Sequence, residues 1–339
     1  MSKLCILLIA LTFGCTSNQE SHDLGARSDN SGNVTSFYVE ALHQNDILVL
    51  GESHQNLRIV KNFNQILKDF EEKYPGQLAL VGLEVFSVYQ PEIDRFLDEN
   101  GPNTEQILLN TPDREALRGT RDEIDAKGGR TPVVSSLFLE VYRTIKDINS
   151  KRRSENKIRI IAVDKQPAAN VIFREYQKNR KKLIDWAVAR DSHMFEQLEH
   201  PIRSLPKNRS ALVYIGSSHA QRGGIENITL PPESGIDSPK VIKWLTTRLV
   251  EGFPQSKVVS AEQINPGNAS CEAIEGKLSA DGVAEPMAID LRSSPLGDIE
   301  NFRGCDDFPV DGATVDFDPT PYKAKDHFDF YTYYPPEKR

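Results

Sequence analysis

The sequence predicts a doubly wound α/β fold, in which a mostly parallel sheet is flanked by helices. Short runs of consecutive apolar residues recur along the 339-residue chain. Such runs are typical of strands that are buried on both faces. Stretches with apolar residues at three- and four-residue spacing lie between several of these runs, as in amphipathic helices. Strands that alternate with helices form crossover units, and crossover units build a mostly parallel sheet.

Six apolar runs are predicted to be strands, and three stretches are predicted to be helices. The strands are residues 46–51, 78–86, 158–164, 211–216, 257–262 and 286–291. The helices are residues 56–74, 135–148 and 238–253. The run "ALVYIG" at 211–216 shows no alternation of apolar and polar residues, so both faces of this strand are expected to be covered.

Composition favours a globular protein and argues against a nucleic-acid partner. Hydrophobic residues make up 38% of the chain and charged residues 27%, which is typical of globular domains. The net charge of −8 indicates no large basic surface that could neutralise phosphates. The densest basic cluster, "SKRRSENK" at 150–157, is predicted to be a solvated helix end.

The first 32 residues are predicted to lie outside the fold. Residues 1–15 combine a short positive start with an apolar run, as in an export signal. The dipeptide Gly14-Cys15 resembles the lipobox of bacterial lipoproteins, although Thr12 and Phe13 stand where a Leu and a small residue are usual. The resemblance implies a lipid on Cys15 and a place in the cell envelope, anchored in the outer membrane; ordinary secretion is the alternative. Residues 16–32 are polar and are predicted to be a flexible tether, followed by a single domain at 33–339.

Export also predicts a disulfide. Cys5 is removed with the signal and Cys15 carries the lipid, so Cys271 and Cys305 remain as a pair in an oxidising compartment. We therefore expect a bond between these two residues.

Polar side chains lie at, or just beyond, the ends of four of the predicted strands. Because ligands bind beyond the carboxyl ends of parallel strands, we expect these side chains to gather at one site. Asp164 is also explained equally well as a helix cap. The residues are Glu52, His54, Glu84, Asp164, Ser217, Ser218 and His219.

Two G-x-x-H motifs, Gly51 to His54 and Gly216 to His219, are the most informative of these strand ends. Two imidazoles and a carboxylate suffice as ligands for a divalent metal that keeps one open position. His54, His219 and either Glu52 or Glu84 would hold the metal, and the other glutamate would act as a general base. The sequence thus predicts a metal-dependent hydrolase.

The motifs "LGESH", "GLEVF", "RDSHM" and "YIGSSHA" resemble the superfamily of ChaN-like haem-binding lipoproteins, erythromycin esterase-like enzymes and Tiki/TraB metalloprotease-like proteins. The resemblance covers residues 33–260, and the tail "DHFDFYTYYP" is similar to the closing strand of several members. It implies that the paired histidine motifs and Glu84 line one cleft, and that Arg190, Asp191 and Met194 match an Arg-Asp motif on a long helix.

The resemblance leaves the chemistry open. A divalent metal and haem are the alternative cofactors, and the ligand is a small molecule, a peptide or haem. Arg190 either binds a substrate carboxylate or a developing anion, or pairs with Asp191 to orient the histidines. Macrolide esterase activity is least favoured, because Ser53-His54-Gln55 replaces the Thr-His-Gly of the esterases.

Overall fold

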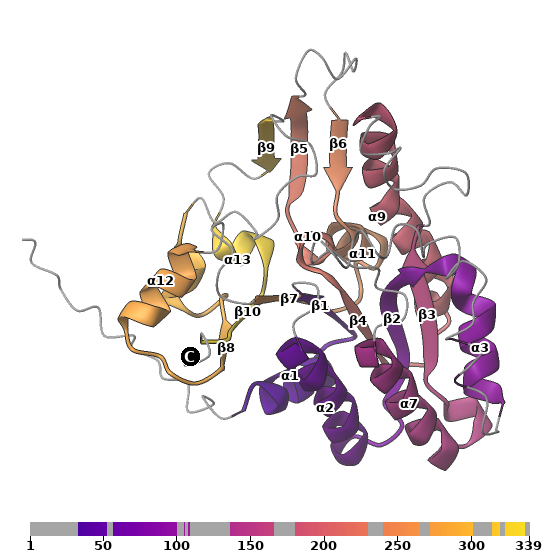
Figure 1. Ribbon diagram of the computed structural model, residues 1–339. Helices are drawn as coiled ribbons and strands as arrows, with labels where there is room; N and C mark the ends of the chain where they lie inside the picture. Colours follow the sequence, from indigo (N-terminus) through magenta and orange to yellow (C-terminus); the bar gives the residue numbers. More distant parts are fainter. Residues whose placement is uncertain are drawn as a thin grey trace, which may run out of the picture.

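The structure is a computed structural model that describes two β-sheets and the helices around them (Figure 1). The described residues are 33–52, 57–99, 105, 108, 136–165, 180–229, 240–264, 272–300, 314–318 and 323–335. Several sequence predictions fall outside these ranges: the signal peptide, the tether, His54, and the cysteines 15, 271 and 305. The lipid anchor and the disulfide therefore stay predictions.

The larger sheet has seven strands in the order β3-β2-β4-β1-β7-β10-β8, all parallel except β8. Each of the six predicted strands is present, with bounds that differ by two residues or fewer. The strands are β1 (Ile47–Glu52), β2 (Leu78–Phe86), β3 (Arg159–Asp164), β4 (Ser210–Gly216), β7 (Val258–Ile264), β8 (Met287–Asp290) and β10 (Phe330–Tyr333). The predicted mostly parallel α/β sheet is confirmed.

Helices cover both faces of this sheet and divide the core into two layers. One layer is packed by α1 (Val34–Gln44), α2 (Leu57–Lys73), α3 (Gln90–Asp98) and α7 (Ser136–Lys151). The other is packed by α9 (Arg180–Arg203), α11 (Leu245–Gly252), α12 (Glu272–Ala280) and α13 (Ala324–His327). Alternate side chains of β1 show the division, because Leu48 and Leu50 join the first layer while Val49 joins the second.

The smaller sheet has three antiparallel strands in the order β6-β5-β9 and lies at the top of Figure 1. Its strands are β5 (Gly224–Thr229), β6 (Lys240–Lys243) and β9 (Thr314–Asp318). The prediction of one helix over 238–253 is therefore wrong in its first half. The β-branched Val241 and Ile242 lie in a strand, and Trp244 is extended (φ −64°, ψ 160°) before α11 begins.

Strand β10 lies between β7 and β8, although it comes from the last part of the described chain. The hydroxyls of Tyr38 on α1 and Thr332 on β10 share a short hydrogen bond, and both side chains are buried. Residues that are 294 positions apart are thus joined inside the first core layer.

The basic cluster at 150–157 is not a solvated helix end throughout. Arg152, one residue beyond α7, forms a partly buried ion pair with Glu71 of α2 and donates a hydrogen bond to the Leu78 carbonyl. No helix in the described ranges is long and apolar enough to cross a membrane.

Candidate functional site

The carboxyl edge of the larger sheet gathers three buried carboxylates. Glu52 ends β1, Asp164 ends β3, and Glu84 lies near the end of β2. Glu52, Asp164 and Glu84 are only 4%, 2% and 4% exposed, respectively. Strand β4 runs between β2 and β1, so Gly216 at its end stands between these acids. The order of strands reverses around β1 and β4, which is where ligands bind in open α/β sheets.

Helix α10 (Ser217–Ala220) begins directly after β4 and carries His219. It sits against Gly51 of β1, where a β-carbon would lie 2.8 Å from the Ala220 Cβ and 3.0 Å from the Ser217 Cα. The first distance is shorter than a β-carbon tolerates, and the second is unusually tight. Gly51 in the first histidine motif therefore makes room for the helix that holds the second histidine.

His219 is held by Asp191 of α9. The His219 Nδ1 lies 2.9 Å from the Asp191 Oδ1, which also accepts a hydrogen bond of 2.7 Å from the backbone N–H of Leu245. Because the carboxylate can only accept, the proton is on Nδ1 and the Nε2 of the neutral imidazole is left as the proton acceptor. This Nε2 is 3.8 Å from the Glu84 Oε1.

Two opposing effects set the pKa of His219. Burial lowers it, because a charged imidazole loses its hydration. The negative charge of Asp191 and its hydrogen bond raise the pKa, with a further contribution from Glu84. Arg190 acts in the lowering direction, but the net result is a pKa above the ordinary value of histidine. The His219 imidazole therefore binds a proton more readily than a free histidine does.

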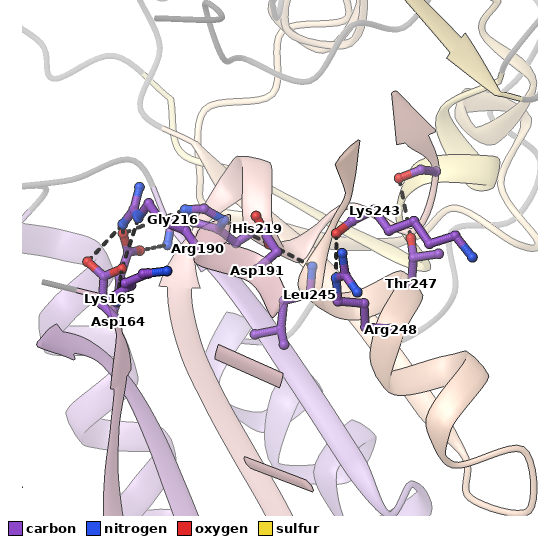
Figure 2. Close-up of polar contacts among 12 residues, drawn as sticks. Asp164, Lys165, Arg190, Asp191, Gly216, His219, Lys243, Leu245, Thr247 and Arg248 are labelled. Atoms are coloured by element: carbon purple, nitrogen blue, oxygen red, sulfur yellow. Dashed lines mark hydrogen bonds and ion pairs between the residues drawn. The ribbon is translucent and has the colours of Figure 1, made fainter. Parts of the chain in front are cut away.

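Arg190 links the acids on the other side of Glu84. Its Nε and Nη2 each lie 2.9 Å from an oxygen of Asp164, and its Nη2 also donates to the Glu84 Oε1 at 2.5 Å. Burial acts to lower the pKa of Arg190, whereas Asp164 and Glu84 raise it and keep the guanidinium charged. Figure 2 shows that Arg190 and Asp191, neighbours on α9, reach in different directions, Arg190 toward Asp164 and Asp191 toward His219.

Glu84 is consequently fixed at both oxygens. Its Oε1 accepts from Arg190, and its Oε2 accepts from the backbone N–H of Gly216. The structure thus joins Asp164, Arg190, Glu84, His219 and Asp191 in one row of contacts along the sheet edge.

Glu52 has different neighbours from Glu84. The Tyr214 hydroxyl lies 3.3 Å from the Glu52 Oε2, and Tyr214 belongs to the core layer packed by α1 and α2. Arg190, by contrast, reaches Glu84 from α9, on the opposite side of the sheet. Burial and the Glu52 carboxylate raise the pKa of Tyr214 well above that of a free phenol, so its hydroxyl is a hydrogen-bond donor.

The described side chains do not fit a metal ion at His219. Within the described ranges, no three His, Cys, Asp or Glu side chains are grouped so that they could hold one. Glu84 and Asp164 are engaged by the Arg190 cation, which would oppose a second cation beside them. The predicted ligand set of His54, His219 and Glu52 includes a residue outside the described ranges, so it stays a prediction, as does the distance between the two histidines.

Two polar residues at this edge, Ser87 and His193, were not among the site residues predicted from the sequence. Ser87 follows β2, and its Oγ lies 2.9 Å from the His193 Nε2 on α9. His193 lies within the "RDSHM" motif, three residues after Arg190, but neither periodicity nor a strand end marks it. Asp164 accepts hydrogen bonds from the N–H of the next residue, Lys165, and from Arg190.

Comparison with solved structures identifies the fold. An erythromycin esterase, EreC, in its open conformation superimposes with a TM-score of 0.54 at 10% sequence identity, over 88% of this chain and 93% of the esterase. A protein from Bacillus cereus gives a TM-score of 0.48 at 12% identity, over 91% and 93% of the two chains. ChaN of Campylobacter jejuni, which binds haem cofacially, gives 0.36 at 12% identity, over 68% and 86%.

No protein-family model and no curated protein sequence matches the chain. At 10% identity, the likeness to the esterase shows a shared fold and carries no residue roles. The chain therefore has the same α/β fold as this erythromycin esterase.

Proposed function

We propose that the chain is a hydrolase in which His219 transfers protons at its Nε2. The observation that supports this most directly is the 2.9 Å contact between the His219 Nδ1 and the buried Asp191 carboxylate. A carboxylate in this position fixes the tautomer and the ring orientation of a catalytic imidazole, and it stabilises the imidazolium that forms during the reaction. The raised pKa of His219 agrees with this role.

Arg190 acts as a positioning residue in this proposal. Because its guanidinium is shared between Asp164 and Glu84, it holds the Glu84 carboxylate 3.8 Å from the His219 Nε2. Glu84 then stabilises the protonated imidazole from the side opposite Asp191. Of the two roles that the sequence left open for the Arg-Asp pair, orientation of the histidine site is favoured over direct binding of a substrate carboxylate.

The substrate class that we propose is an ester, with water as the attacking group. The solved structure that matches with a TM-score of 0.54 is named as an erythromycin esterase, and a histidine base is sufficient to activate water against an ester carbonyl. The donor set at His219 favours acid–base chemistry without a resident metal there, because Arg190 already neutralises Glu84 and Asp164. Whether a metal or haem is bound, with His54 as a ligand, is a separate question that elemental analysis and an absorbance spectrum address.

The test uses the full chain and p-nitrophenyl esters of short acids. We expect turnover that falls by about 10²-fold or more in His219→Gln, the usual contribution of a general base. The matched control is His200→Gln on the exposed end of α9, which should keep the wild-type rate. Equal ester turnover in wild type and His219→Gln would disprove the role of His219.

Elemental analysis and an absorbance spectrum of the same sample separate the remaining alternatives. Protein without stoichiometric metal that still hydrolyses esters supports the acid–base proposal. A transition metal at one equivalent, whose removal abolishes turnover, would instead favour the metal-dependent hydrolase predicted from the paired motifs. A Soret band would favour the haem-binding alternative.

We also propose that the chain is anchored in the cell envelope through a lipid on Cys15, with the membrane as its partner. The support is the apolar run that ends at Gly14-Cys15 and the polar residues 16–32 that follow. Cys15→Ser should move the protein from the detergent phase to the aqueous phase after export. Unchanged partitioning would remove the support for lipidation.

A further inference from the structure

Ser87 and His193 form a hydrogen bond at the carboxyl edge of the sheet, apart from His219. Ser87 is the first residue of the 3-10 helix η1 (Ser87–Tyr89), which follows β2 without a gap. Its Oγ lies 2.9 Å from the His193 Nε2 on α9. Both residues are partly exposed, and their hydrogen bond lies in a partly buried place.

We propose that Ser87 is a nucleophile activated by His193, which gives the chain a serine-based site for acyl transfer from esters. A hydroxyl and an imidazole within hydrogen-bond distance are the arrangement that activates a serine. The Ser87 Oγ attacks the ester carbonyl carbon while its proton passes to the His193 Nε2. The ester C–O bond then breaks, and the leaving alkoxide takes that proton from His193. Water hydrolyses the acyl-serine in a second step, with His193 again as the base.

The charges that face His193 keep it in the form that can accept a proton. Burial lowers its pKa, and the cation of Lys165, just after β3, lowers it further. Glu196 on α9 and Asp164 at the end of β3 act in the opposite direction, but the net pKa is below the ordinary value of histidine. The imidazole is therefore neutral at neutral pH.

This inference goes beyond the proposed role of His219 and does not depend on it. His193 lies three residues after Arg190, so the two side chains leave neighbouring positions on one face of α9. The row of contacts that ends at His219 contains neither Ser87 nor His193. The label on Ser87 reports on this site alone, and ester turnover compared between Ser87→Ala and the double variant with His219→Gln reports on His219 alone.

A fluorophosphonate tests the proposal, because it reacts with activated serines and forms an O–P bond as fluoride leaves. The full chain is incubated with an alkyl fluorophosphonate at pH 7.5, and the modified residue is located by peptide mass mapping. We expect one phosphonyl group on Ser87 and none in Ser87→Ala. His193→Gln should slow the modification by about 100-fold, the contribution expected of a general base. Two matched controls, His200→Gln and Ser204→Ala on or next to the same helix, should leave the rate unchanged.

Two results would overturn the inference: no phosphonyl group on Ser87, or an equal rate of modification in His193→Gln. If that variant proves unfolded by circular dichroism, the pH profile of the wild type decides instead. Activation by His193 predicts a rate that reaches half its plateau below pH ~6.5, the ordinary pKa of histidine. A rate that rises in proportion to hydroxide up to pH 9 would contradict it. Unmodified Ser87 together with ester turnover lost in His219→Gln would reject this inference and keep the proposed function.

Discussion

Gly51 of β1 and Ala220 of α10 pack so closely that a methyl group on Gly51 would lie 2.8 Å from the Ala220 Cβ. The same methyl group would lie 3.0 Å from the Ala261 carbonyl oxygen on the neighbouring strand β7. The position of His219, one residue before Ala220, therefore depends on the absence of a side chain in β1. A sequence motif that looks catalytic at Gly51 has a packing role as well.

Gly51→Ala should destabilise the fold by about 1–3 kcal/mol, the usual cost of overpacking a well-packed core. Because α10 must shift to accept the methyl group, ester turnover should fall as well. Urea denaturation and the ester assay measure the two effects. Gly276→Ala in α12 is the control, because open space surrounds that position and alanine favours a helix. A Gly51→Ala protein with wild-type stability would contradict the packing argument.

Asp191→Asn should lower the pKa of His219, because the carboxylate is the main group that raises it. The amide can also donate to the imidazole, which favours the wrong tautomer, so we expect turnover to fall by up to about 10⁴-fold. An NMR titration of the His219 ring protons measures the pKa directly. The control is Asp147→Asn on the exposed side of α7. A His219 pKa that does not move would show that Asp191 has no electrostatic role.

Arg190→Met should cost about 3–5 kcal/mol of unfolding free energy, because it leaves Glu84 and Asp164 buried without their cation. Arg95→Met removes a similar side chain from an exposed pair with Glu99 and should cost less than about 1 kcal/mol. Urea denaturation of both variants gives the comparison. A similar loss of unfolding free energy in the two variants would mean that the buried ion pair stabilises the fold no more than the exposed pair does.

His327 should make the protein sensitive to acid. Its side chain is fully buried on α13, and burial lowers its pKa to about 4. The unfolded chain binds a proton near pH ~6.5 but the folded chain does not, so stability is complete above that pH and is lost as the pH falls toward 4. His327→Gln should flatten this part of the stability profile. His43→Gln on the exposed end of α1 should leave the profile unchanged, and equal acid sensitivity in both variants would contradict the assignment.

Tyr38→Phe should destabilise the protein by about 1–3 kcal/mol, because it leaves the buried Thr332 hydroxyl without its partner. The double variant with Thr332→Val should recover part of this loss, since both polar groups are then absent. Thermal or urea unfolding of the two single variants and the double variant completes the cycle. Strictly additive losses would show that the two hydroxyls do not interact.

Most of the larger sheet could be predicted from local sequence, because a strand buried on both faces must be apolar throughout. The strand predicted from the run "LALVGLEVF" begins and ends at the same residues as β2. The smaller sheet could not be predicted in the same way. In β6, Lys240–Lys243, the apolar residues continue at helical spacing into α11, and only the extended backbone at Trp244 separates the two elements. Strand β10 was indicated by the resemblance of the tail and not by a pattern of its own.

Strand ends drew attention to Glu84 and His219, but the 3.8 Å contact between them depends on strand order. Because β4 lies between β2 and β1, the Glu84 carboxylate meets Gly216 and His219, whereas Glu52 meets Tyr214. Periodicity contains no information about that order. Ser87 and His193 could not be predicted for a related reason, since a serine in a turn and a histidine on a helix are ordinary until the fold brings them 2.9 Å apart.

The place of β10 between β7 and β8 has a consequence for synthesis on the ribosome. Strand β8 pairs only with β10 in the seven-stranded sheet, and about 40 residues separate Asp290 from Phe330. At a translation rate of about 5–20 residues per second, β7 keeps an open edge for some seconds before β10 emerges. Open edges of this kind pair readily with other chains, so the nascent protein is exposed to aggregation during that interval. Chaperones that shield strand edges should therefore bind the nascent chain between the completion of β7 and the release of β10.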